Sequence, residues 1–320
     1  MSDPRVTLGI PSMNNQRTIW DTLSAFAEQT VPPDRVHIVD ASTDWTPYIA
    51  ELFRERSDPP FELDIERQTD STGVGAARAR IYEEFEGDIL ACFDTNGNPS
   101  EDWLETHLRI HEKLPVDVVS GVAENLESGF VDSPHDRGFL VQNNSTIKKR
   151  ALDAVDGWDE QFDRGEDWDM AIRLCRSGAK AYTRSDLGRT SLRDEGMWSR
   201  VRTRLGRPSS VRFLRKYGLW YAKFHPVHVL GDFVSVISLI AAAGVLPLLG
   251  IIGLLAIVLL FVPLAGATAY ATVQTRNRTS GGIQLTYAVK RMPEFFLFGY
   301  TAIREIIHGP REGWNYGGIE

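Results

Sequence analysis

The chain has 320 residues and a formal net charge of -8, and this charge is divided unevenly along it. Residues 1–195 carry 38 acidic and 21 basic side chains, a net charge of -17, whereas residues 196–320 carry 5 and 14, a net charge of +9. The length accommodates one substantial domain and a smaller second part. Two cysteines, Cys92 and Cys175, are too few to form a zinc framework alone, and their apolar surroundings predict buried, reduced side chains.

Short apolar runs alternate with helical patterns over the first 120 residues. Strands are predicted at residues 6–10, 35–40, 61–67 and 88–94, and helices at residues 18–30, 45–56 and 74–85. Strands that alternate with helices are typical of βαβ units around a mostly parallel sheet. In such sheets ligands bind outside the carboxyl ends of the strands. We therefore expect a site at that edge.

Polar sequences follow three of the predicted strands: PSMNN at 11–15, DASTD at 40–44 and DTN at 94–96. Taken singly, an aspartate at such a position can equally be a turn or helix-capping residue. The stretch GVGAAR at 73–78 can likewise be a helix start without a ligand, because the G-x-G-x-x-G fingerprint is incomplete. Their joint appearance at successive strand ends favours a pocket at one edge of the sheet.

An acidic cluster occupies residues 159–169. Trp168, Ile172 and Cys175 recur at helical spacing, which predicts a helix beginning near Glu166 with Asp167 in its first turn. The helix dipole favours an ionised carboxylate there, and a carboxylate at a pocket rim can act as a general base. Helix capping is the alternative interpretation. Asp169 should be turned away from the pocket.

The C-terminal part contains 43 consecutive uncharged residues, 233–275. This length is sufficient for two membrane crossings, with a reversal at GVLPLLG, residues 244–250. Basic flanks predict that both ends of this hairpin are cytoplasmic. A buried helical hairpin in a soluble core is the disfavoured alternative. Residues 292–309 contain charges that favour an interfacial helix, with a third crossing as the other possibility.

These patterns predict three parts. Residues 1–226 form an α/β domain with a basic juxtamembrane segment at about 196–226, residues 227–275 form two transmembrane helices, and residues 276–320 form a cytoplasmic tail with the interfacial helix. The beginning, MSDPRVTLGIPS, lacks a basic segment followed by an apolar core, so we expect no cleaved secretory signal. The predicted location is the cell membrane, with several spans and a cytoplasmic catalytic domain.

Six segments resemble, in order, the motifs of family 2 glycosyltransferases with a GT-A fold. They are VTLGIPSMNNQRTIWDTL, IVDASTDWT, GVGAARAR, CFDTNGNPSEDWL, NNSTIKKRALDAVDGWDEQF and GEDWDMAIRL. The resemblance covers about residues 5–180. It implies a Rossmann-like α/β catalytic domain with a mostly parallel sheet, followed here by the predicted transmembrane hairpin.

The resemblance also implies donor-binding residues. Pro11, Asn14 and Asn15 match the loop after the first strand, which packs on the nucleotide of the donor. Asp40 matches the aspartate that hydrogen-bonds the base. Arg78 matches an arginine near the donor pyrophosphate.

Metal binding and catalysis are implied in the same way. Asp94 and Asn96 occupy the outer positions of the Asp-x-Asp motif, so Mg²⁺ or Mn²⁺ is the expected cofactor, with both residues as its ligands. Asp94 is also expected to bind the nucleotide-sugar donor. Asn96 stands where the family usually has an aspartate, which predicts weaker metal binding and leaves a metal-independent variant open. Asp167 matches the catalytic base, and a single displacement inverts the configuration of the sugar.

Glu166, Trp168, Arg193 and Arg200 are candidates for binding the acceptor or a phosphate; attraction of the two arginines to anionic head groups is the alternative. The expected partners are a nucleotide-sugar donor, a polyprenyl (dolichol) phosphate-linked acceptor and membrane lipids, without nucleic acid. The acidic, arginine-rich composition resembles that of haloarchaeal enzymes of dolichol-linked glycan assembly in protein N-glycosylation, which predicts a hexosyl- or hexuronosyltransferase. The rivals are a polysaccharide-chain synthase and a catalytically silent membrane scaffold.

Overall fold

The computed structural model describes residues 3–69, 73–95, 97–122, 128–132, 139–140, 143–160, 162, 165–185, 187, 189–191, 210–219, 221, 233, 236–237, 303 and 307. It divides the chain into two compact units, Met1–Asp194 and Glu195–Glu320. The first unit ends close to where the sequence places the start of the basic segment. The wider division into 1–226, 227–275 and 276–320 stays a prediction.

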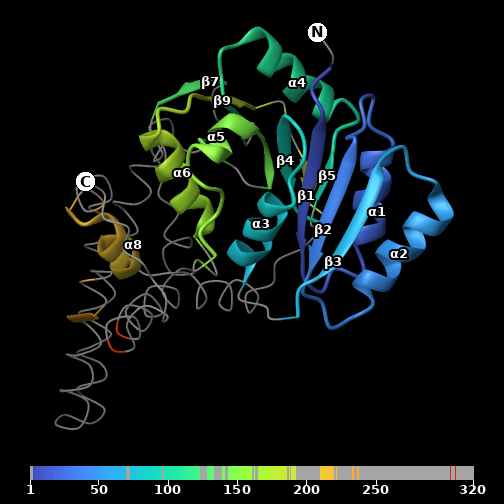
Figure 1. The fold of residues 1–320 in the computed structure, drawn as a ribbon, viewed down its shortest axis with the longest axis horizontal. Coiled ribbons are helices and arrows are strands. Elements are labelled where there is room, and N and C mark those ends of the chain that lie inside the picture. The colour runs from blue at the N-terminus through green and yellow to red at the C-terminus, as the bar shows by residue number, and fades with distance from the viewer. Residues whose placement is uncertain are drawn as a thin grey trace, which may run out of the picture. The chain divides into compact units, whose positions relative to one another are not determined.

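The described elements of the first unit follow the predicted alternation closely (Figure 1). The first half contains β1 (Val6–Ser12), α1 (Ile19–Ala27), β2 (Arg35–Asp40), α2 (Thr46–Ser57), β3 (Glu62–Arg67), α3 (Val74–Glu83) and β4 (Ile89–Phe93). The second half contains β5 (Gly97–Pro99), α4 (Trp103–Lys113), β6 (Val118–Gly121), β7 (Gly129–Val131), β8 (Asn144–Lys148), α5 (Lys149–Asp153), α6 (Glu166–Arg176), β9 (Ala181–Arg184) and β10 (Arg189–Ser191).

Eight of these strands form one mixed sheet in the order β3-β2-β1-β4-β8-β6-β9-β7. The strands β3, β2, β1 and β4 run parallel, as predicted. Strand β8 runs antiparallel to both β4 and β6, and β7 runs antiparallel to β9. A separate antiparallel pair joins β5 to β10. Because β1, β2 and β4 are parallel, the segments that follow them meet at one edge of the sheet.

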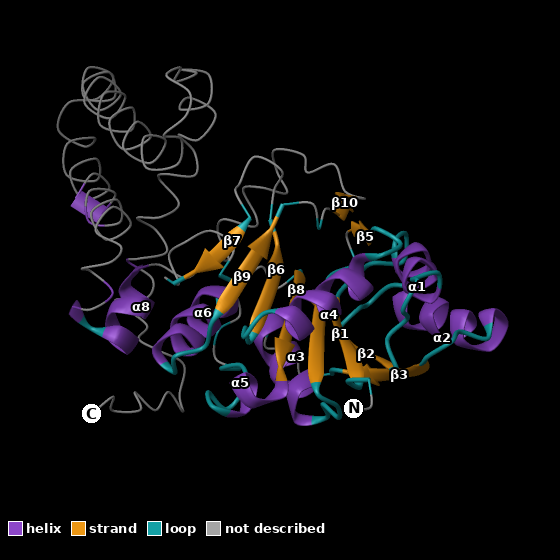
Figure 2. Cartoon of the chain, turned by 90° about the horizontal axis from the view of Figure 1, so that it is seen from above, coloured by secondary structure: helices purple, strands orange, loops and turns teal. Residues whose placement is uncertain are grey.

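Helices cover both faces of this sheet, and each face has its own apolar core. Side chains of α1, α2 and α4 pack on one face, including Leu23, Phe26, Phe53 and Trp103. Side chains of α3, α5 and α6 pack on the other, including Ile81, Leu152, Met170 and Leu174. In Figure 1, α1 and α2 accordingly lie on the opposite side of the central strands from α3, α5 and α6, and Figure 2 shows the strands edge to edge between them.

Strand β1 extends two residues beyond its predicted end and includes Pro11. A proline has no N–H to donate, so it is poorly tolerated where a strand is paired on both sides. Here the pairing of β1 with β4 ends at Gly9 and Cys92, and Pro11 lies opposite Val39 of β2 alone. Pro11 is therefore a strand residue next to the site, not a residue of the following loop.

Helix α3 begins at a close backbone contact. Gly73, which precedes it, has a φ of 111°, a value that glycine adopts easily. A Cβ atom on Gly75 would lie 2.1 Å from the carbonyl oxygen of Phe162. The glycines of the GVGAAR stretch therefore have a packing role, which fixes α3 against the segment that leads into α6.

The second unit is described in part. Helix α8 (Ser210–Tyr217) carries Arg212, Arg215 and Lys216 and is followed by Tyr221, whose ring stacks on that of Phe213 with centroids 5.1 Å apart. Of the uncharged stretch 233–275, only Phe233, Val236 and Ile237 are described, and most of 292–309 also lies outside the described residues. Within the described part of the chain, no helix combines the length and apolar character of a membrane span.

Candidate active site

Asp94 follows the last residue of β4 and is held by Arg78 of α3. The Nη2 atom of Arg78 donates a hydrogen bond of 3.0 Å to Oδ1 of Asp94. The arginine side chain is 4% exposed, whereas that of Asp94 is 29% exposed. Burial would by itself lower the pKa of the Arg78 guanidinium, but the nearby carboxylates, Asp94 foremost, raise it. Arg78 is therefore a charged group inside the protein, with Asp94 between it and the surface.

Glu166 approaches the same guanidinium from the start of α6. Its Oε1 lies 3.7 Å from Nε of Arg78, and the carboxyl group is buried. Burial, together with the charge of Asp167, raises the pKa of Glu166 to about 8. The same burial favours the protonated form of Glu166.

Asp167 lies in the first turn of α6, as predicted. The helix begins after Gly165, whose φ of 80° is left-handed, and no side chain caps it. Oδ1 of Asp167 accepts a 2.9 Å hydrogen bond from the backbone N–H of Trp168, one of the first-turn donors that lack an intrahelical partner. The carboxylate is half-buried. This bond orients Asp167 at the positive end of the helix.

The buried face of α6 includes carboxyl groups that its apolar pattern does not indicate. Trp168 is 38% exposed, and the buried face instead includes Met170, Leu174 and the carboxyl groups of Glu166 and Asp169. Asp169 is completely buried and accepts a 2.8 Å hydrogen bond from Nε of Arg173. The apolar spacing of Trp168 gave no indication that charged residues occupy the inner face.

Cys175 also differs from its expected state. Its side chain is only partly buried, and Sγ lies 3.4 Å from the carbonyl oxygen of Asp132. Cys92, in contrast, is buried as expected, and burial raises the pKa of its thiol to about 11. Neither cysteine is part of a disulfide.

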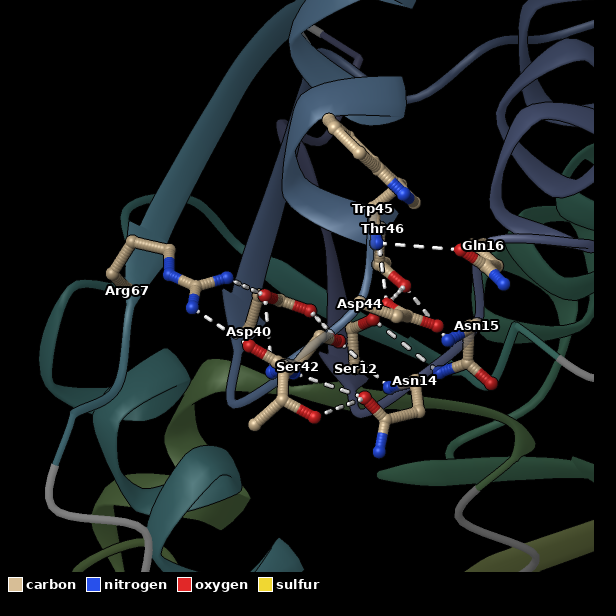
Figure 3. Close-up of polar contacts among 11 residues, drawn as sticks. Ser12, Asn14, Asn15, Gln16, Asp40, Ser42, Asp44, Trp45, Thr46 and Arg67 are labelled. Carbon is tan, nitrogen blue, oxygen red and sulfur yellow. Dashed lines mark hydrogen bonds and ion pairs between the residues drawn. The ribbon is translucent and has the colours of Figure 1, made fainter.

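The loops after β1 and β2 are tied together by hydrogen bonds, which Figure 3 shows. The backbone N–H of Asn14 donates a 2.7 Å hydrogen bond to Oγ of Ser42, and Oδ1 of Asn14 accepts a 3.0 Å hydrogen bond from the N–H of Thr43. Asn14 has a φ of 56°, which asparagine tolerates better than most residues. The backbone N–H of Asn15 donates 2.8 Å to Oγ1 of Thr46. The two asparagines thus fix one loop against the other.

Asp40, the last residue of β2, is 1% exposed and is enclosed by the protein. Its Oδ1 accepts a 2.6 Å hydrogen bond from Oγ of Ser42, and its Oδ2 accepts hydrogen bonds from the N–H of Ser42 and from Nη1 of Arg67. Nη2 of Arg67 also donates 2.7 Å to the carbonyl oxygen of Ser42. Asp40 therefore organises a rim at the carboxyl edge of the sheet, which Ser42 and Arg67 complete. Its predicted contact with a nucleotide base stays a prediction.

Sequence reasoning missed Arg67. It is the last residue of β3 and lies opposite Asp40 in the register of the parallel strands. The segment 61–67 was predicted as a strand of this sheet, so its carboxyl end was expected at the same edge. The signal that could have identified Arg67 is its position at the end of β3, because a basic side chain there lies beside the aspartate at the end of β2.

Asp44 supports the start of α2. It accepts a 3.0 Å hydrogen bond from the N–H of Thr46 and a second from the threonine hydroxyl. Although burial acts to raise it, these bonds hold the pKa of Asp44 below its usual value. Asp44 therefore has the helix-supporting role that the sequence left open for the aspartates of this segment.

Asp94 is the described residue on which binding of the implied divalent metal depends. Among the described residues no three His, Cys, Asp or Glu side chains form a metal cluster, and Asn96, Arg193 and Arg200 lie outside those residues. Mg²⁺ is commonly held by one or two carboxylates together with substrate phosphates. The hydrogen bond from Arg78 uses Oδ1 of Asp94, so Oδ2 is the oxygen suited to a metal shared with a diphosphate. Asp94 thus fits this mode of binding.

The amino-acid sequence matches a known family and named relatives. The family model described as "Glycosyl transferase family 2" matches residues 7–168. A glycosyltransferase from Haloferax volcanii, AglE, is 30% identical over 152 residues, which cover 46% of this chain and 49% of the relative. The beta-monoglucosyldiacylglycerol synthase of Synechocystis sp. is 27% identical over 194 residues, covering 53% of this chain and 40% of the relative. The chain thus spans half or less of the length of these relatives.

Solved structures share the fold. The mannosyltransferase PcManGT from Pyrobaculum calidifontis, in complex with GDP-Man and Mn²⁺, superposes with a TM-score of 0.58 at 17% identity, covering 96% of this chain and 88% of the other. Residues 1–349 of TarS from S. aureus, in complex with UDP-GlcNAc, superpose with a TM-score of 0.52 at 17% identity, covering 69% and 72%. The predicted GT-A-like α/β fold is therefore confirmed. The match over half of its length shows that this chain belongs to glycosyl transferase family 2.

Proposed function

We propose that this chain is an inverting glycosyltransferase that moves one sugar from a nucleotide-sugar donor to a polyprenyl phosphate-linked acceptor at the cytoplasmic face of the membrane, in the assembly of glycans for protein N-glycosylation. The observation that carries the enzymatic part is the arrangement around Arg78. One carboxylate suited to a metal, Asp94, and the first turn of α6, with Asp167, meet at the same buried guanidinium.

The two carboxyl groups at the start of α6 have different roles. Pairs of titratable groups whose environments separate their pKa values commonly divide acid and base functions between them. The raised pKa of Glu166 favours its protonated form, and this leaves Asp167 as the proposed base. It takes the proton of the acceptor hydroxyl as that oxygen attacks the anomeric carbon. The bond from that carbon to the diphosphate breaks with its electron pair, and the nucleoside diphosphate leaves.

Donor binding rests on the edge formed by β1, β2 and β4. The loop of Asn14 and Asn15 and the rim organised by Asp40 suit the nucleoside, and Asp94 suits the diphosphate through a shared Mg²⁺ or Mn²⁺. When bound, such a metal would neutralise the negative charge that develops on the leaving diphosphate. The fold shared with proteins crystallised with GDP-Man and UDP-GlcNAc supports a nucleotide-sugar donor.

A membrane acceptor is supported by the second part of the chain. Residues 196–231 carry eight basic and no acidic side chains, and the 43 uncharged residues that follow are long enough for two spans. Such an anchor keeps a catalytic domain beside the bilayer. The name of one relative, beta-monoglucosyldiacylglycerol synthase, denotes a lipid product, which makes lipid glycosylation the appropriate class of reaction to test first.

The test is mass spectrometry of lipid-linked glycans from cells that lack this protein, compared with cells that carry wild-type protein or an Asp167→Asn variant. The proposal predicts a polyprenyl-linked glycan shortened by one sugar in the first and third cultures. A change confined to diacylglycerol glycolipids would reassign the acceptor. Loss of a long polysaccharide would support a chain synthase, and full function of Asp167→Asn would support a silent scaffold.

The membrane topology has a separate test. If the hairpin prediction holds, a reporter fused after Glu320 and the catalytic domain are both protected from protease added outside intact cells. A reporter that is cleaved from outside contradicts the model of two spans. The uncharged stretch itself provides the control, since its deletion should release the catalytic domain from the membrane fraction.

A further inference from the structure

We infer that Arg78 is a positioning residue, which fixes Asp94 for metal binding and does not itself hold the donor pyrophosphate. The inference deepens the proposed function and rests on it. Family resemblance alone assigns Arg78 to the vicinity of the pyrophosphate, whereas its contacts in this chain are with carboxyl groups.

Burial is the first argument. The guanidinium is 4% exposed and its Nε has no hydrogen-bond partner, although the carboxyl group of Glu166 lies 3.7 Å from it. A buried charge is costly unless it is paired. Arg78 satisfies this need through Asp94, and turning outward to a phosphate would break the 3.0 Å hydrogen bond that compensates its burial.

The helix that carries Arg78 packs closely against the segment before α6. Gly75 lies one helical turn before Arg78, and its close contact with the carbonyl of Phe162 prevents α3 from moving toward that segment. Arg78 therefore extends from a closely packed helix to the end of β4. A planar guanidinium in such a position constrains the direction of the carboxylate that it binds.

The hydrogen bond from Arg78 determines which oxygen of Asp94 is available to a metal. The hydrogen bond occupies Oδ1 on the buried side, while the side chain keeps 29% of its surface exposed. Oδ2 is then the oxygen that would hold a bound metal. Groups that hydrogen-bond a metal-ligating carboxylate orient it, and their substitution typically lowers metal affinity or activity by about 10- to 100-fold.

The experiment measures how much Mn²⁺ strengthens nucleotide binding. Calorimetry of the whole chain with UDP and with GDP, in Mn²⁺ and in chelator, gives the ratio of the two dissociation constants. Arg78→Lys keeps the charge but loses the planar fork, so it should reduce this ratio by about 10-fold or more. Arg80→Lys is the matched control, because Arg80 is on the same helix but is 44% exposed and pairs with glutamates; its ratio should equal that of the wild type.

A double-mutant cycle separates the two roles. If Arg78 acts through Asp94, Arg78→Lys should have no further effect on the ratio in an Asp94→Asn background. If it binds phosphate directly, the substitution should change nucleotide affinity equally in both backgrounds and in chelator, and the inference is then overturned. An unchanged ratio in Arg78→Lys with intact Asp94 also overturns it.

Two outcomes identify where a failure lies. A wild-type chain that binds neither nucleotide contradicts the proposed function itself, and one that binds equally with and without Mn²⁺ overturns the inference along with the metal part of that function. If Arg78→Lys does not fold, a crystal structure of the wild type with Mn²⁺ and a nucleoside diphosphate decides. The inference requires Nη2 to remain on Oδ1 of Asp94; a phosphate oxygen within about 3.2 Å of the guanidinium refutes it.

Discussion

Asp169→Asn should destabilise the protein strongly, although the sequence predicts only that this residue is turned away from the pocket. Asp169 is completely buried, and its Oδ2 accepts from Nε of Arg173 at 2.8 Å. The same arginine donates 2.6 Å hydrogen bonds to the carbonyl oxygens of Val155 and Gly157. The pair therefore connects α6 to the turn that follows α5.

The magnitude follows from which interactions remain. Removing one partner of a buried ion pair costs about 3–5 kcal/mol. Asparagine keeps an oxygen that can accept a hydrogen bond, and Arg173 keeps its two carbonyl partners, so we expect the lower end, about 3 kcal/mol. The measurement is the free energy of unfolding from denaturant titration.

The matched control is Asp153→Asn. Asp153 pairs with Lys149 at 2.7 Å, but both side chains are more than two-fifths exposed, and exposed pairs contribute about 0–1 kcal/mol. A loss below about 1 kcal/mol for Asp169→Asn, or equal losses for the two variants, would refute the structural role assigned to Asp169.

The remaining predictions concern pH and the metal. Burial holds the pKa of His107 well below its usual value and lowers that of His111 to about 4. Since both are neutral when folded, their contribution to the free energy of unfolding should be fully present above about pH 6.5 and should be lost as the pH falls toward 4. Denaturant titrations at several pH values test this. An unchanged midpoint between pH 7 and 5 would contradict this. Asp94→Ala should abolish transfer, whereas Asn96→Asp should remain active and bind Mn²⁺ more tightly because it supplies a second anionic ligand. Transfer measured against Mn²⁺ concentration tests both; an active Asp94→Ala in chelator would remove the metal assignment.

The first half of the fold was predictable because its local signals agree. The four parallel strands and three helices have the expected order, since apolar runs of strand length alternate with amphipathic stretches and end at turn residues. Strands β5 and β7 are three residues each, and β8 is antiparallel in an otherwise parallel region. Such short elements depend on tertiary pairing, which periodicity alone does not indicate.

The site was predictable in its members but less so in their partners. Asp94, Asp167 and Arg78 were identified from ordered motifs, and the structure brings Arg78 to Asp94 and to the start of α6. The pairing of Arg67 with Asp40 and the burial of Asp169 were missed. Both depend on the burial of an aspartate against an arginine, which the sequence pattern does not indicate, because burial reverses the usual expectation for charged side chains.

The central claim is that Asp167 is the general base, and one pair of measurements on Asp167→Asn tests it most directly. Nucleotide-sugar affinity and turnover are measured on the same folded protein in the presence of Mn²⁺. Asparagine retains an oxygen for the N–H of Trp168, so we expect affinity near that of the wild type and turnover lower by about 100-fold or more. Turnover close to that of the wild type would contradict the account, because it would leave Asp167 with the helix-supporting role alone.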